Sequence, residues 1–333
     1  MGLLKLACVF ALVIGAGSVS FAQEAKKSLT VMQGLSTPDF GYLPTYLARA
    51  KSFSADEALD LKVVVMRAPV SVTALITGEI QFAVAGPSIT AALKGAPLKA
   101  IFFTYKTSTL QFAVRPEIRA PEDLKGKAIA ILSPGATHDQ VTRLMLKKLG
   151  LDPVSDVRLV AIGDSKARVI AMEAGQIAGS ANNPDVAAQL VRRGYRILTN
   201  SSDVYPIPFS GIAVNHQLIR KNPEVIRRWL RAHLRAMLFI RQYPDDAAQV
   251  AAREFRLDIE VAREAIRQAL GFMSADDPGG FTEKGMRLHL QYTARLLGVD
   301  PEKVAISQVA DLNFLREAQR QMGIYCREGY LCK

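Results

Sequence analysis

The chain has 333 residues, of which 49% are hydrophobic and 22% are charged. This balance excludes a disordered chain, a collagen-like fibre and a coiled coil, and the length favours two domains because single cores rarely grow beyond ~250 residues. The net charge of +11 is spread along the sequence, without any recognised nucleic-acid motif. We therefore expect no nucleic-acid partner and attribute the charge to solubility and to weak attraction of anions.

The first 22 residues have the pattern of a secretory signal peptide. Lys5 precedes an uncharged apolar stretch over 6–19, and Ser20 and Ala22 are the small residues that a signal peptidase reads. The stretch is shorter than the ~20 residues that a membrane-spanning helix needs. We predict cleavage after Ala22 and an exported, soluble product.

The cysteine pattern agrees with export. After removal of Cys8, Cys326 and Cys332 remain, separated by five residues that include a glycine. An oxidising compartment favours a disulfide between them. Metal binding is the weaker alternative because no histidine lies nearby and zinc sites need more ligands. We predict a small stapled loop in the tail and no metal or other cofactor.

Strands and helices alternate along the first half of the chain, which predicts an α/β fold with mainly parallel sheets. Short apolar runs rich in β-branched and aromatic residues predict strands at 29–33, 61–66, 82–85, 99–104, 128–132, 158–162 and 177–180. Helical patterns are predicted at 44–50, 70–77, 88–94 and 138–149, the last with a capping-box spacing of Thr137 and Gln140.

Two stretches of this half are related to each other. Residues 29–88 and 126–185, paired at a constant offset of 97, share 11 identities in 60 positions, and their predicted strands, helices and loops fall in phase. We interpret them as two lobes of similar topology built from related halves.

The last third of the chain is mostly helical. A strand is predicted at 211–215 and an apolar stripe from Val225 to Leu238, followed by amphipathic helices at 245–254, 259–270, 282–297 and 311–322. These helices need a surface to bury against, for which lobe 1 is the natural candidate. The chain would then cross between lobes near 111–114 and 210–214, as in a hinged binding protein. We expect lobe 1 to span 28–110 with 212–322, lobe 2 to span 111–211, and the tail to span 323–333.

Catalytic and metal motifs are absent from the sequence. The four histidines have no metal-ligand spacing, and His233 shares a helical face with Trp229 and Met237, which indicates packing. The adjacent acids at 245–246 and 276–277 lie beside prolines or helix starts and are interpreted as turn and N-cap residues rather than an acid–base pair. Nothing in the sequence indicates covalent chemistry, and we expect no enzyme activity.

Candidate binding residues lie in the loops after the predicted strands, the edge at which open α/β sheets bind ligands. These loops are rich in glycine, serine, threonine and asparagine, and they lead into helices whose free N–H groups can hold an acceptor-rich ligand. They cover 34–42, 67–71 and 86–88 in lobe 1, and 133–137 and 181–185 in lobe 2.

Several of these segments resemble substrate-binding proteins of the nitrate/sulfonate/taurine type from ABC transporters, relatives of thiamine-pyrimidine-synthase-like proteins. The resemblance covers residues 28–320. It is carried by the segments Gly41-Tyr42-Leu43-Pro44, 74–82 (ALITGEIQF), Gly86-Pro87-Ser88, 121–127 (PEDLKGK) and 133–138 (SPGATH). It implies a type II periplasmic binding fold, a hinge, and a ligand held in the interlobe cleft.

The resemblance also implies partners and contacts. The partners would be a small solute and an inner-membrane ABC permease, and we expect a periplasmic monomer. Matched loop by loop, and with one loop asparagine and one loop aromatic added, the ligand contacts would be Ser36, Asp39, Tyr42, Pro87, Ser88, Gly135, Ala136, Thr137, His138, Asn183 and Phe209. The chain departs from the family pattern at Gln81, Ala178, Asn182 and Asn183, which puts the substrate rather than the fold in question.

Two other functions share the fold. A pyrimidine-synthase-like enzyme would need a cysteine-rich metal motif that this chain lacks, whereas a ligand-sensing partner of a signalling receptor would use the same cleft. The solute is also open. Asp39, Asp139 and Asp185 disfavour an anion, while His138 and Lys166 could compensate. With aromatic residues in the predicted loops, we favour an aromatic or heterocyclic, neutral or zwitterionic solute.

Overall fold

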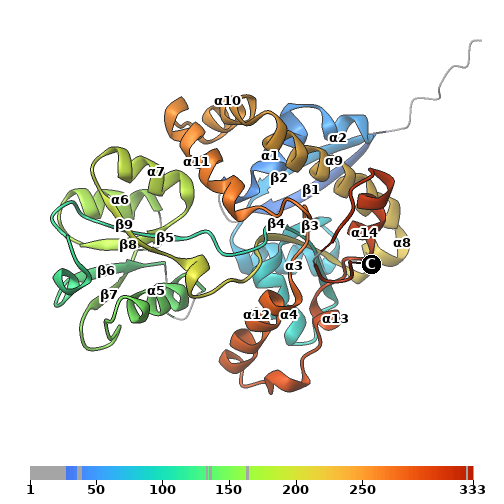
Figure 1. Cartoon of the computed structure of the whole chain (residues 1–333). Coiled ribbons are helices and arrows are strands. Elements are labelled where there is room, and N and C mark those ends of the chain that lie inside the picture. The colour runs from blue at the N-terminus through green and yellow to red at the C-terminus, as the bar shows by residue number, and fades with distance from the viewer. Residues whose placement is uncertain are drawn as a thin grey trace, which may run out of the picture.

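The molecule has two lobes, and each is built on a five-stranded sheet that is covered by helices (Figure 1). The computed structural model describes residues 28–35, 40–132, 134, 137–162, 165–327 and 329–332. The signal pattern at 1–22 lies outside these residues. Within them, no helix is both long and apolar enough to cross a membrane.

The first sheet has the strand order β2-β1-β3-β10-β4, and we call this sheet with its helices lobe 1. Its strands are β1 (Leu29–Leu35), β2 (Leu59–Val65), β3 (Phe82–Val84), β4 (Leu98–Tyr105) and β10 (Phe209–Asn215). The short elements between them are η1 (Phe40–Tyr42), α1 (Leu43–Ala50), α2 (Phe53–Asp56), α3 (Ala68–Thr77) and α4 (Ala85–Leu93).

The second sheet has the order β7-β6-β8-β5-β9, and with its helices we call it lobe 2. Its strands are β5 (Gln111–Val114), β6 (Ala128–Ile131), β7 (Arg158–Ala161), β8 (Gly179–Asn182) and β9 (Arg196–Asn200). The helical elements are η2 (Pro121–Leu124), α5 (Thr137–Lys148), α6 (Ser165–Glu173), α7 (Pro184–Arg192) and η3 (Ser201–Asp203).

The two sheets have the same topology, as the offset of 97 residues predicts. Strands β1, β2 and β3 fall on β6, β7 and β8 when 97 is added, and α3 and α4 fall on α6 and α7. In each sheet one strand, β10 or β5, runs antiparallel between its two neighbours. Each sheet is therefore mixed: four strands run in one direction, as a mainly parallel sheet predicts, and the strand that follows a crossing runs in the opposite direction.

The crossings lie a few residues away from their predicted positions. The chain leaves lobe 1 between Tyr105 and Gln111 and returns between Asn200 and Phe209, so 111–114 and 210–214 belong to β5 and β10. The observed crossings thus lie directly beside the segments near which they were predicted. Strand β5 was not recognised because four residues carry little periodicity, whereas the strand at 211–215 was predicted. Strand β10 thus begins three residues before the expected lobe boundary at 211/212.

The C-terminal helices complete lobe 1. They are α8 (His216–Lys221), α9 (Pro223–Gln242), α10 (Pro244–Phe255), α11 (Ile259–Phe272), α12 (Glu283–Leu296), η4 (Pro301–Lys303), α13 (Ile306–Val309) and α14 (Asn313–Gln321). Buried apolar residues of α9 to α14 form one continuous core with the first sheet, as predicted, whereas the buried apolar residues of lobe 2 form two separate clusters. Helix α11 also contacts α7 of lobe 2 and lies between the lobes (Figure 1).

Candidate functional site

Phe209 marks the position where the two lobes meet. Its half-buried ring packs against both the lobe 1 core and the larger core cluster of lobe 2. It is the first residue of β10 and pairs with Tyr105 at the end of β4, directly beside the first crossing. An aromatic side chain at this point can contact a solute that both lobes enclose.

The backbone after Phe209 is unusually constrained. Ser210 has a φ of 52°, in the left-handed region that non-glycine residues rarely adopt. A Cβ at Gly211 would approach Phe103 to 2.4 Å and the Cβ of Ala85 to 2.8 Å, so only glycine fits there. Strand β10 therefore lies tightly against the start of α4, which fixes Phe209 relative to that helix.

The predicted contacts of lobe 1 that the structure describes lie at the starts of α1 and α4. Tyr42 is half-buried immediately before α1, and Pro87 is half-buried in the first turn of α4. Ser88 is buried, and its hydroxyl donates to the backbone oxygen of Val84 over 2.8 Å. That bond within the helix start uses the hydroxyl hydrogen of Ser88 and leaves its oxygen as an acceptor only. The predicted contacts Ser36 and Asp39 lie outside the described residues.

His138, at the lobe 2 edge, holds two strands together. Its Nε2 lies 2.9 Å from the backbone oxygen of Ala181, and its Nδ1 accepts from the backbone N–H of Leu132 over 3.2 Å. A carbonyl oxygen only accepts, so Nε2 carries the proton and neither ring nitrogen is free for a solute. Burial, with the nearby charge of Arg168, lowers the pKa of His138 to about 4. The expectation that His138 compensates a bound anion is therefore wrong.

The remaining predicted contacts of lobe 2 are placed only in part. Thr137 is the first residue of α5, while its side chain, Gly135 and Ala136 lie outside the described residues. Asn183 is half-buried in extended backbone at the N-cap of α7. Its neighbour Asn182 is buried, and its amide folds back onto Ser180 of the same strand. Among the predicted contacts of lobe 2, His138 and Asn183 are those whose side chains the structure describes.

The charges at this edge differ from those inferred from the sequence. Asp139 is buried and accepts from Arg143 over 2.7 Å, so its charge is compensated within α5. Arg168 of α6, which sequence reasoning missed, is buried close enough to His138 to lower its pKa, and donates to the backbone oxygen of Ile162 over 3.1 Å. At the offset of 97 residues, Arg168 corresponds to Ser71, which lies in one of the predicted ligand loops of lobe 1. This equivalence could have identified Arg168 from the sequence. Lys166 is exposed.

Helix α11 makes a second contact between the lobes, beside the end of β8, where Gln111 pairs with Asn182. Gln111 of β5 donates from Nε2 to Gln268 Oε1 of α11 over 2.7 Å. Arg192 at the end of α7 lies 3.9 Å from Asp258, beside a groove of about 620 Å³ between α7, α10 and α11. The groove is lined by charges of both signs and is separate from the predicted site.

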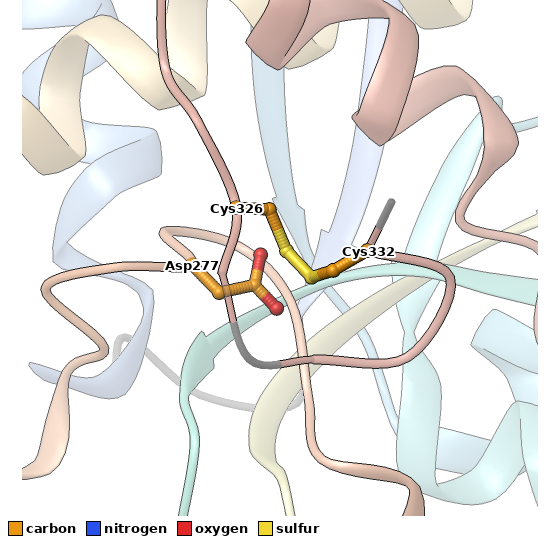
Figure 2. A group of neighbouring side chains, drawn as sticks. All are labelled: Asp277, Cys326 and Cys332. Atoms are coloured by element: carbon orange, nitrogen blue, oxygen red, sulfur yellow. A yellow bond between two sulfur atoms is a disulfide. The ribbon is translucent and has the colours of Figure 1, made fainter.

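Asp277, between α11 and α12, lies beside Cys326 and Cys332 of the tail, and the three form the one cluster of metal-ligand residue types found among the described residues (Figure 2). The two cysteines form a disulfide with their Cα atoms 5.4 Å apart. Both oxygens of Asp277 accept from Arg316, and one also accepts from Gln319. The donor set therefore does not suit a metal. Asp277 lies in a turn, as predicted, because its backbone oxygen accepts from the N–H of Gly280 over 3.2 Å. Its side chain is in addition the buried partner of an ion pair, which the sequence did not indicate.

The chain belongs to the family described as NMT1/THI5 like, whose model matches residues 39–247. The matched segment begins within the first predicted ligand loop and ends in α10, so it includes all of lobe 2 and the parts of lobe 1 from η1 to β4 and from β10 to the start of α10. This match confirms the family resemblance that the sequence motifs indicate.

Particular relatives refine this class. The chain is 26% identical over 303 residues to the riboflavin-binding protein RibY of Chloroflexus aurantiacus, covering 84% of this chain and 83% of RibY. Its fold is similar to that of the periplasmic aliphatic sulphonate binding protein SsuA of Escherichia coli (TM-score 0.69, 18% identity, 92% and 96% coverage). It is also similar to the periplasmic nitrate-binding protein NrtA of Synechocystis PCC 6803 (TM-score 0.69, 16% identity, 89% of each chain). The desulfurization enzyme DSZB has the same fold (TM-score 0.62, 18% identity, 88% and 99% coverage).

Proposed function

We propose that this protein is a periplasmic solute-binding protein that captures a small organic molecule between its lobes and delivers it to an ABC-transporter permease. The observation that carries the proposal is Phe209, which packs against the cores of both lobes beside the crossings. Tyr42, Pro87 and Asn183 would complete the described part of the site. Membership of the family and the periplasmic relatives support this role, and the lobes would move about the segments 106–110 and 201–208.

We favour a flat aromatic or heterocyclic solute over a small inorganic anion. The half-buried rings of Tyr42 and Phe209 offer apolar faces for stacking, and the riboflavin-binding relative supports this class. The neutral His138 adds no positive charge for a nitrate or sulfonate. An enzyme role is the weaker proposal, since the described site shows no nucleophile paired with a general base, and a sensing role would use the same cleft with a different partner.

We expect riboflavin, as the probe, to bind with a micromolar or lower Kd in calorimetric titration, and nitrate and ethanesulfonate to give no response. Replacing Phe209 by alanine should weaken riboflavin binding about fivefold, because a stacked aromatic contact contributes roughly 1 kcal/mol. Phe314→Ala in α14, remote from the cleft, is the control and should bind normally. Micromolar binding of either anion without any response to aromatic compounds would contradict the proposed solute class.

Export should be visible at the N-terminus. We expect the protein expressed with its first 22 residues to be recovered from the periplasmic fraction with an N-terminus at Gln23, as read by mass spectrometry of the intact chain. A charged residue in the apolar stretch, such as Leu12→Arg, should retain the full-length chain in the cytoplasm, because it interrupts the apolar segment. Full-length protein in the cytoplasm without that substitution would contradict the proposed location.

A further inference from the structure

Four buried polar side chains are linked in a ring of hydrogen bonds inside lobe 1. They are Gln33 of β1, Thr45 of α1, and Trp229 and His233 of α9, and none is more than 2% exposed. Gln33 Nε2 donates to Thr45 Oγ1 over 2.9 Å, and Trp229 Nε1 donates to Gln33 Oε1 over 3.1 Å. His233 contacts the backbone oxygen of Trp229 at 2.9 Å and Thr45 Oγ1 at 3.1 Å.

The ring has a single consistent direction. The backbone oxygen of Trp229 can only accept, so the proton of His233 is on Nδ1 and its Nε2 is an acceptor. The hydroxyl of Thr45, which accepts from Gln33, therefore donates to Nε2. The hydroxyl of Thr45 thus both accepts and donates, and protonation of His233 would reverse the bond to Thr45, because Nε2 would then be a donor. Burial lowers the pKa of His233 to about 3, which agrees with a neutral ring.

The ring joins the elements that carry the lobe 1 contacts. Gln33 lies two residues before the end of β1, and Thr45 lies three residues after Tyr42. The indole of Trp229 stacks between the imidazole of His233, at 3.4 Å, and the ring of Phe82 in β3, at 4.8 Å. Strand β3 leads directly into α4, which carries Pro87. One network thus connects β1, α1 and β3 behind the site.

Apolar packing alone would stabilise this core, whereas directional hydrogen bonds also fix the positions of its elements relative to one another. An apolar interface allows a helix to shift by a fraction of an ångström at little cost, whereas a satisfied buried network permits one register. We infer that this ring holds Tyr42 and Pro87 in the positions that the solute requires, and that Gln33, Thr45 and His233 are positioning residues. The inference rests on the proposed function.

The test compares substitutions that keep volume but differ in hydrogen bonding. Thr45→Val removes the hydroxyl that both Gln33 and His233 use, while Thr45→Ser retains it. Thr293→Val removes a buried hydroxyl of α12, whose bond to the backbone oxygen of His289 lies outside the network. We expect riboflavin affinity to fall at least tenfold in Thr45→Val, to change less than threefold in Thr45→Ser, and to be unchanged in Thr293→Val.

Hydrogen–deuterium exchange gives a readout that needs no solute. In Thr45→Val we expect faster exchange confined to the backbone of 40–47 and 82–88, with the rest of lobe 1 protected as in the unmodified protein. Loss of protection throughout lobe 1, or no loss of protection at all, would mean that the ring contributes only to core packing. Either outcome would overturn the inference. If Thr45→Val does not fold, Trp229→Phe, which removes one donor and keeps the stack, must show the same confined pattern. Absence of riboflavin binding to the unmodified protein would refute the proposed solute class. The exchange experiment alone would then test whether the ring fixes the positions of 40–47 and 82–88.

Discussion

Lowering the pH from 7 to 5 should reduce the free energy of unfolding by about 5 kcal/mol, through three buried histidines. Burial lowers the pKa of His138 and His289 to about 4 and that of His233 to about 3, from an ordinary value of 6.5. Between pH 6.5 and 4 the unfolded chain binds these protons and the folded protein does not. The stability that depends on the neutral rings is complete above pH 6.5 and is lost as the pH falls.

Urea unfolding followed by circular dichroism at pH 7, 6 and 5 measures this effect. The slope should approach three protons, or about 4 kcal/mol per pH unit, in a range where carboxylates contribute little. His289→Leu is the matched variant, because Nδ1 of His289 is buried without a hydrogen-bond partner among the described residues. That variant should lose about a third of the slope and no stability at pH 7. A slope below one proton would show that the rings are protonated in the folded protein.

The parts of this fold that repeat along the sequence could be predicted, whereas strands that are fixed mainly by their neighbours in the sheet could not. The offset of 97 residues predicted the equivalence of α3 with α6 and of β3 with β8, because local patterns repeat wherever the topology repeats. The strands β5 and β9 were missed. Each is only four or five residues long and is fixed by its neighbours in the sheet rather than by its own sequence.

The site was less predictable, because sequence indicates which loops meet but not where their side chains point. Ser88 and His138 lie in the predicted segments, yet both are bonded to backbone of their own lobe. Arg168 was overlooked because a single arginine in a helix does not reveal its burial. Asp277 and Arg316 are 39 residues apart, and only the tertiary fold joins them.

Arg316 of α14 fixes the C-terminal tail through a saturated set of bonds. Its guanidinium donates to both oxygens of Asp277, to Gln319 Oε1 over 2.8 Å, and from Nε and Nη2 to the backbone oxygen of Tyr330 over 3.1 and 2.6 Å. All five N–H groups are used, and the side chains of Arg316 and Asp277 are 5% and 3% exposed. The ring of Tyr330 stacks on Phe281, and its N–H donates to the backbone oxygen of Phe281 over 2.9 Å.

Replacing Arg316 by methionine should therefore cost about 3–5 kcal/mol of stability, since it leaves the carboxylate of Asp277 buried without its counter-ion. The double variant Arg316→Met with Asp277→Asn removes both charges and should recover more than half of that loss, because no unpaired charge remains. Urea unfolding at pH 7 measures both, and Arg320→Met, an exposed neighbour on α14, is the control. Equal losses in the single and double variants would mean that the pair acts through packing alone. The tail loop closed by Cys326 and Cys332 would then be held by Tyr330 stacking rather than by the buried charge.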